Sequence, residues 1–111
     1  MKRCCFSIKN KLRQQRDFEN VFKNGIFQKS NAFTAYYLEN EETFSRLGVS
    51  VSRKVGIAVL RNRIKRTVRE WFRKKCADFP KAIDLVIVFR KAMPAFSRKA
   101  LREELEKTIT F

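Results

Sequence analysis

The apolar positions of the chain follow two periods, one helical and one extended, and their alternation along the sequence predicts its elements. Near the start, Phe18, Val21 and Phe22 are spaced as one face of a helix, and Gly25 follows as a stop signal. The helical period returns twice later in the chain. It predicts helices over about 14–24, 57–76 and 98–109, with Ser97 as the N-cap of the last.

Extended segments are indicated where apolar side chains recur at every second position. Strands are expected within 26–39 and over about 43–53, because both regions alternate in this way. The stretch 84–90 is apolar almost throughout, which predicts a short central strand buried on both faces. The order of elements is therefore α-β-β-(β)-α-β-α, an α+β sandwich with helices packed against a small sheet.

The two faces of the expected strands differ in chemistry. The core faces are predicted to carry Phe33, Ala35 and Tyr37 in the first region and Leu47, Val49 and Val51 in the second. The opposite faces carry Thr34, Tyr36 and Leu38, and then Gly48, Ser50 and Ser52. The small polar groups of the second region suit a shallow binding surface.

Length and charge narrow the class of protein. The 111 residues correspond to one small domain, and 26 Lys and Arg against 11 Asp and Glu give a formal net charge of +15. The apolar share of 44% excludes a disordered polycation. Residues 1–13 are expected to form a basic flexible tail, and 14–111 a single folded domain. Such a charge indicates a polyanionic partner, most commonly nucleic acid.

No segment of the sequence suggests export or membrane insertion. The basic start has no secretory apolar stretch, and the apolar runs are too short to span a bilayer. The cysteines, Cys4, Cys5 and Cys76, have no C-x-x-C spacing, which favours a reducing compartment and argues against a metal finger. Cys76 is interpreted as a small buried residue. We therefore expect a cytoplasmic protein without a membrane partner.

Residue types that perform catalysis are scarce. The chain has no histidine, which removes His-based acid–base catalysis and His-ligated metals. Its carboxylates suit caps and surface positions rather than a facing pair, and no Gly-rich phosphate loop occurs. We therefore expect no catalytic residue, no metal site and no cofactor bound by the protein itself.

The strongest charge feature is the segment 53–75, whose ten cations and one acid give a net charge of +9. On a helix, Arg61, Lys65, Arg69 and Arg73 follow at four-residue spacing and repel one another. A solvated helix face normally mixes both signs, so this pattern favours a face that binds a polyanion. The alternatives are a merely solvated face and a membrane-surface helix. The second is weakened because the core needs the apolar side of this helix.

Aromatic residues form the second candidate feature. Phe18 and Phe22 share one helix face, and Tyr36 lies on a strand face beside a small hydroxyl side chain. Rings of this kind stack with unpaired bases while nearby cations hold phosphates, which indicates a channel for single-stranded nucleic acid. On composition alone, core packing is an equally good interpretation of Phe18 and Phe22.

The segments 47–56 and 58–70 resemble the signature of the bacterial ribonuclease P protein subunit. Its hallmark is the sequence Arg61-Asn62-Arg63 on a helix. Further similarity lies in 16–25, which contains Phe18 and Phe22, and in 85–91, a strand followed by two cations. The resemblance runs in order over roughly 14–107, nearly the whole chain.

The resemblance implies an αβββαβα fold with a left-handed crossover through the long helix. It also implies a partner, the catalytic RNA of ribonuclease P, which with Mg²⁺ removes the 5′ leader of precursor tRNA. The chain would then be the non-catalytic subunit of an endoribonuclease, with no protein partner implied. By position, the leader-binding cleft would comprise Phe18, Phe22, Thr34, Tyr36 and Ser50, with Asn62, Lys65, Arg66 and Arg69 nearby. Contact with the catalytic RNA would involve Arg53, Lys54, Arg61 and Arg63.

Other functions fit parts of the pattern. A ribosomal or other structural RNA-binding protein with no role in cleavage would share the charge and the aromatic face. A helix-turn-helix DNA-binding protein is disfavoured, because no short helix is predicted directly before the long basic one. A nuclease that acts by itself is disfavoured by the missing histidine and the missing pair of facing carboxylates.

Overall fold

The computed structural model of the chain describes residues 11–12, 14–41 and 44–109. Within these residues, three α-helices and four strands follow in the expected order αβββαβα. They are α1 (Gln15–Asn24), β1 (Ile26–Lys29), β2 (Thr34–Glu39), β3 (Arg46–Val51), α2 (Ala58–Lys75), β4 (Ile83–Phe89) and α3 (Arg98–Thr108). Two short 3₁₀ helices, η2 (Arg53–Val55) and η3 (Cys76–Asp78), flank α2. The predicted α+β class is confirmed.

The sheet has the strand order β1-β2-β4-β3, which puts β4 between two neighbours. β2 pairs antiparallel with both β1 and β4, whereas β3 pairs parallel with β4, so the sheet is mixed. Because parallel neighbours need a crossover connection, the chain passes through α2 between β3 and β4. Every residue of β4 is buried, which confirms the central strand predicted from its apolar run.

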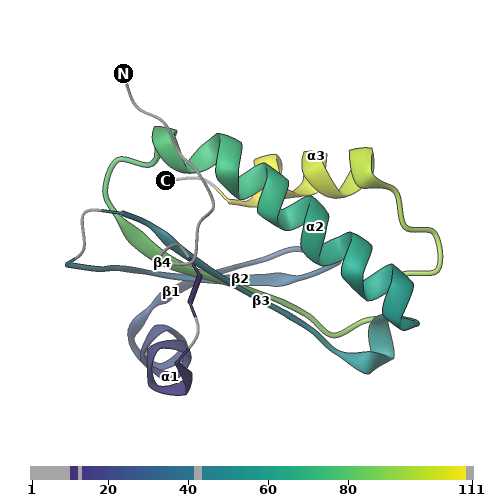
Figure 1. The fold of residues 1–111 in the computed structure, drawn as a ribbon, viewed down its shortest axis with the longest axis horizontal. Helices are drawn as coiled ribbons and strands as arrows, with labels where there is room; N and C mark the ends of the chain where they lie inside the picture. Colours follow the sequence, from purple (N-terminus) through teal and green to yellow (C-terminus); the bar gives the residue numbers. More distant parts are fainter. Residues whose placement is uncertain (1–10, 13, 42–43, 110–111) are drawn as a thin grey trace.

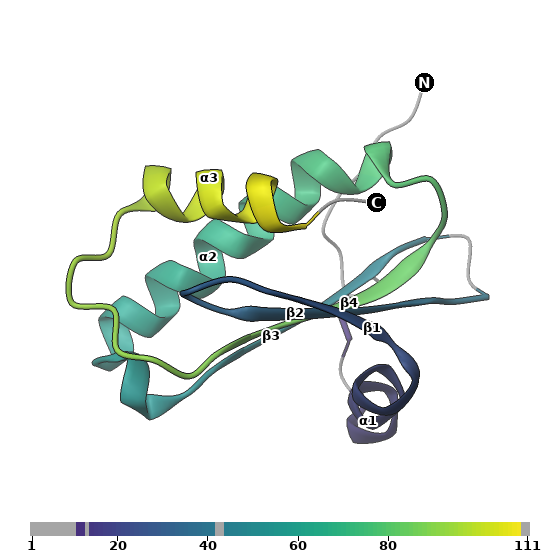
Figure 2. The same cartoon turned by 180° about the vertical axis from the view of Figure 1, so that it is seen from behind.

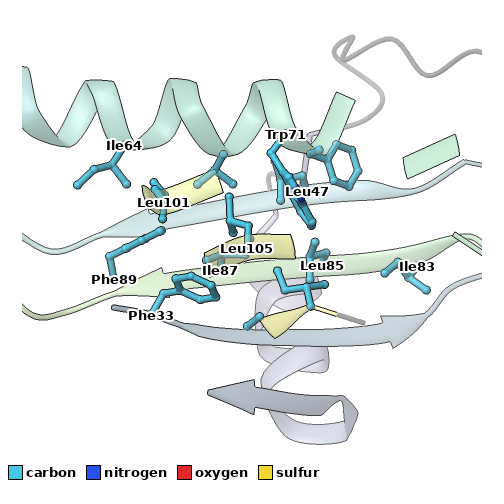
Figure 3. Packing of buried hydrophobic residues seen from close by; sticks show 14 of the residues in the cluster. Phe33, Leu47, Ile64, Trp71, Ile83, Leu85, Ile87, Phe89, Leu101 and Leu105 are labelled. Carbon is cyan, nitrogen blue, oxygen red and sulfur yellow. The ribbon is translucent and has the colours of Figure 1, made fainter. Parts of the chain in front are cut away.

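Helices cover both faces of the sheet, with α2 and α3 on one face and α1 on the other (Figure 1, Figure 2). The larger core lies between the sheet and the α2/α3 layer, and Figure 3 shows Leu85, Ile87 and Phe89 of β4 within it. A smaller core lies on the α1 face and contains Leu12, Val21, Val86 and Val88. The alternation of β4 therefore divides its side chains between two cores.

The strand faces assigned from alternation are confirmed. Phe33, Ala35 and Tyr37 belong to the larger core or pack against it, whereas Tyr36 and Leu38 pack against the smaller one. The N-cap prediction for α3 also holds, since the hydroxyl of Ser97 accepts a hydrogen bond from the amide of Ala100 at 3.3 Å.

Helix α1 packs on the sheet through Val21, which is fully buried, and through the ring of Phe18. That ring lies on Gly48 of β3: a Cβ atom there would be 2.5 Å from Cε1 and 2.7 Å from Cζ of Phe18. Any side chain at this position would displace the ring, so glycine is required for α1 to approach β3 this closely.

Two residues of the segment predicted as a basic tail, Lys11 and Leu12, lie against the sheet. Leu12 is 5% exposed and belongs to the smaller core, and its amide donates to the carbonyl of Leu47 at 2.9 Å. Lys11 forms a parallel bridge with the same residue. Burial of an apolar side chain beside the edge strand β3 stabilises this stretch, which the basic composition of the tail concealed. Residues 1–10 and 13 lie outside the described residues.

Cys76 differs from its interpretation as a plain buried residue. It is half-buried, because it lies at the C-cap of α2 on the periphery of the larger core. It also takes part in a disulfide bond, so it is not a free thiol. Cys4 and Cys5 lie outside the described residues.

A buried carboxylate, Asp84 of β4, connects several elements. It is 4% exposed, and Arg46 of β3 donates to both of its oxygens, from Nε at 2.8 Å and from Nη2 at 2.7 Å. Asn40 donates to the same carboxylate at 2.8 Å, and Arg46 also faces Asp17 of α1 at 3.7 Å. Since a buried charge is costly unless it is paired and hydrogen-bonded, these contacts hold β4, β3 and α1 in one arrangement.

We expect Arg46→Met to lower the free energy of unfolding by about 3 kcal/mol, because it leaves the Asp84 carboxylate buried without its cation. Lys81→Met is the matched control: Lys81 and Glu39 are 3.4 Å apart, with side chains 68% and 60% exposed. An exposed pair of this kind contributes at most about 1 kcal/mol. Urea unfolding measures the difference as a shift in midpoint at unchanged slope. Equal losses in the two variants would contradict the role assigned to Asp84.

Candidate nucleic-acid interface

Four aromatic rings follow one another from α1 across the sheet to β1, and we call them the aromatic row: Phe18, Phe22, Tyr36 and Phe27. The ring centroids of Phe18 and Phe22 are 6.5 Å apart. Those of Phe22 and Tyr36 are 4.9 Å apart in an edge-to-face arrangement at 80°, and Tyr36 and Phe27 are 6.1 Å apart. These are the separations of rings in contact.

The rings differ in how much surface they leave to solvent. Phe18 and Tyr36 are half-buried against the smaller core, whereas Phe22 is 41% exposed and Phe27 is 63% exposed. Phe18 therefore belongs partly to the packing of α1, as the core interpretation allowed. Phe22 and Phe27 present apolar ring surface that no other part of the described chain covers.

The sheet register orders the side chains of the α1 face into rows across the strands. Phe27, Tyr36, Val86 and Gly48 stand opposite one another in one row. The neighbouring row, which we call the hydroxyl row, consists of Lys29, Thr34, Val88 and Ser50. Within it Thr34 is half-buried and Ser50 is exposed. The five residues predicted for the cleft thus lie together, three of them in the aromatic row and two in the row beside it.

The outer side of α2 carries exposed cations, as its pattern predicts. Its core side buries Ile64, Thr67, Val68, Trp71 and Phe72. The exposed polar and charged residues are Asn62, Arg63, Arg66, Arg69, Arg73 and Lys74, and Lys65 is half-buried. Arg53 and Lys54 are exposed on η2, directly before this helix. A guanidinium group presents several donors in a fork that matches phosphate, so this face suits a nucleic-acid backbone.

Arg61 differs from the other cations of α2. Its Nε donates to the backbone carbonyl of Gly56 at 3.1 Å, and the residue is half-buried. This bond ties the first turn of α2 to the loop that follows η2. Arg61 therefore stabilises the start of the helix. The other N–H groups of its guanidinium can donate to a ligand.

A hollow of about 400 Å³ on α2 is lined by Asn62, Arg66, Arg69, Glu70 and Arg73. Glu70 supplies the one negative charge, and its Oε1 accepts a hydrogen bond from Nη2 of Arg98 at 2.7 Å. Because that pairing compensates the carboxylate, the three arginines leave the hollow positive. It is therefore a suitable place for an anionic group.

The aromatic row and the basic face of α2 lie in different layers of the molecule (Figure 1, Figure 2). The four residues expected near the cleft, Asn62, Lys65, Arg66 and Arg69, belong to α2 and do not line the α1 face of the sheet. The physical reason is that β4 needs cover on both faces, and the apolar side of α2 supplies it on the side opposite α1. The connecting segment is η2, which leads from the Ser50 end of β3 into α2 and bears Arg53 and Lys54.

Other chemistry is limited in the part of the chain that the structure describes. No group of three or more potential metal ligands gathers there, and no helix is long and apolar enough to cross a membrane. The carboxylates of Asp17 and Asp84 both face Arg46, which holds them in ion pairs. Helix α2 follows a strand and a single 3₁₀ turn, an arrangement unlike a helix-turn-helix.

Two features of this site were missed from the sequence. Phe27 lies in a strand of only four residues, so its face is defined by its register with β2 and not by its own alternation. The bond between Arg61 and Gly56 depends on how the loop before α2 is bent. The only available signal was the occurrence of an aromatic residue two positions after the predicted helix stop at Gly25.

Comparison with known proteins gives the relatives of this chain. The family model described as Ribonuclease P matches residues 6–110. The ribonuclease P protein component of Thermotoga petrophila is 39% identical over 102 residues, which are 92% of this chain and 80% of that protein. A solved structure of a Staphylococcus aureus RNase P protein mutant has a TM-score of 0.81 at 31% identity and covers 91% of each chain. The RNase P protein from Thermotoga maritima has a TM-score of 0.76 at 37% identity, over 87% of this chain and 92% of that one. The chain therefore belongs to the ribonuclease P protein family.

Proposed function

We propose that this ribonuclease P protein subunit holds the single-stranded 5′ leader of precursor tRNA on the aromatic row and contacts the catalytic RNA through α2 and η2. The observation that carries the proposal is the pair of surfaces in separate layers, one aromatic and one cationic. Aromatic rings stack with unpaired bases of any sequence, which suits leaders that differ between precursors. Arginine forks bind phosphates, which suits a folded RNA.

The hydroxyl row supplements the rings in this proposal. Thr34 and Ser50 offer hydroxyl groups that both donate and accept, and Lys29 adds a cation at the β1 end of the same row. Such groups bind the phosphates and 2′-hydroxyls that connect stacked bases. A leader strand would therefore find rings for its bases and polar groups for its backbone on neighbouring rows of one sheet face.

Hydrolysis of the phosphodiester belongs, in this proposal, to the partner RNA and its Mg²⁺. Two observations support that division: the chain contains no histidine, and the carboxylates beside the aromatic row are occupied by Arg46. Mg²⁺ prefers oxygen ligands and commonly binds through phosphates, which the RNA supplies. The side chains of this protein bind and orient the substrate.

We expect the purified protein alone to leave precursor tRNA intact. Cleavage at the mature 5′ end should require both the cognate catalytic RNA and Mg²⁺, because the described site offers groups for binding and none positioned for hydrolysis. End-labelled precursor tRNA resolved on a denaturing gel measures this, with chelation of Mg²⁺ as the control. Site-specific cleavage by protein freed of RNA would contradict the proposal.

We expect affinity for the catalytic RNA to fall steeply with salt, because each neutralised phosphate releases counterions. Replacing Arg63 and Arg66 together by Ala should flatten the plot of log K against log salt by about one to two units. The matched control replaces Lys99 and Arg102 of α3, which are also exposed cations. Binding titrations over a salt series measure the slope. If the slope changed only in the control variant, we would conclude that α3, and not α2, contacts the RNA.

Substitution of Phe22 distinguishes a role in leader binding from a role in core packing. Because Phe22 is 41% exposed, Phe22→Ala should cost much less stability than the loss of a fully buried ring. It should weaken binding of leader-bearing tRNA to the holoenzyme by about 1–3 kcal/mol per stacked base and leave mature tRNA unaffected. Phe33 is the contrasting ring, since it is 3% exposed and packs on Phe89 at 5.4 Å. Phe33→Ala should cost about 3–5 kcal/mol of stability. If the Phe22→Ala holoenzyme distinguished leader-bearing from mature tRNA as well as the parent does, Phe22 would not belong to the leader site.

A further inference from the structure

Phe27 is a large aromatic side chain that the core does not use. It is 63% exposed on β1, an edge strand of the sheet. We infer that Phe27 is an additional stacking platform that extends the leader site by one unpaired base toward the β1 edge. This inference rests on the proposed function of the aromatic row, and it concerns how far along the leader that site reaches.

The register of the sheet places Phe27 in the aromatic row. Phe27 stands directly opposite Tyr36, and the two ring centroids are 6.1 Å apart with planes inclined at 42°. Tyr36 contacts Phe22 on its other side at 4.9 Å. Tyr36 is therefore an interior member of the row, and Phe27 is its most exposed end. A strand that stacks on Phe22 and crosses Tyr36 meets Phe27 next.

The charge around Phe27 suits a nucleic-acid strand. Lys29 lies two residues further along β1, on the same face, opposite Thr34. The four residues of β1 carry one cation and no acid. An ammonium group one row from an exposed ring can bind the phosphate adjoining the stacked base. The combination of ring and cation favours an RNA strand over a purely apolar partner.

The other side of β1 gives a matched control. Ile26 is 60% exposed, close to the value for Phe27, but it stands opposite Tyr37 and so faces the side of α2 and α3. Exposed apolar residues on an edge strand also favour pairing between copies of a chain. A contact between two copies of the chain is thus the competing explanation for the exposure of Phe27. Ile26→Ala removes an exposed apolar side chain from the same strand and leaves the aromatic row intact.

The test uses the holoenzyme reconstituted with its catalytic RNA and a series of precursor tRNAs whose leaders grow by one nucleotide. For the parent protein, affinity should increase with leader length until the last platform is occupied. Phe27→Ala should remove the final increment, an approximately fivefold or larger loss, and leave the shorter leaders unchanged. Phe27→Tyr should retain that increment and Phe27→Leu should lose it, because stacking needs a ring. Ile26→Ala should behave like the parent.

The outcomes separate this inference from the proposed function. If Phe22→Ala reduces leader binding but Phe27→Ala leaves the affinity unchanged at every leader length, the extension toward β1 is wrong while the leader site stands. If neither variant alters leader dependence, the aromatic row does not bind the leader and the proposed function fails as well. Sedimentation of the free protein reports self-association. A Phe27→Ala change in oligomeric state without a change in leader binding would assign the ring to a contact between copies.

Discussion

The burial of β4 on both faces is the constraint on which the rest of the structure depends. All seven of its residues are buried, so a packed layer is needed on each side of the sheet. In the described part of the chain, α2 and α3 supply the larger layer and α1 the smaller. Because α1 has only ten residues, it covers the sheet incompletely. Phe27, Tyr36, Thr34 and Ser50 of the candidate site lie on that face of the sheet, and Phe18 and Phe22 border them from α1.

Much of this arrangement could be predicted because the local patterns are strong. Alternation separated Phe33 from Tyr36, and the four-residue spacing of cations separated the outer side of α2 from its buried side. The run in β4 predicted its central position, since only a strand covered on both faces tolerates so continuous an apolar sequence. Of the residues carried over from the family pattern to the cleft, Thr34 and Tyr36 fall on one face because side chains two apart on a strand share a face.

The remainder depends on contacts between segments distant in the sequence. Nothing local indicates that α1 and α2 lie on opposite faces, because each has an apolar side that could meet either face of the sheet. Leu12 is buried through its contact with an edge strand, although its neighbours in the sequence are basic. The position of Phe27 in the aromatic row depends on strand pairing. The hydrogen bond from Arg61 to Gly56 depends on the path of the loop before α2. Sequence periodicity does not carry this information.

If both surfaces bind RNA as proposed, their placement in opposite layers affects how strongly the second strand binds. Under the proposed function, α2 holds one RNA and the sheet fixes the aromatic row at a constant distance from it. A strand belonging to a substrate docked on that RNA would then meet the rings at an effective concentration in the range of about millimolar. One or two stacked bases, at about 1–3 kcal/mol each, hold little between free molecules but suffice in this setting. Since the spacer is a rigid sheet, no linker entropy is lost when both contacts form.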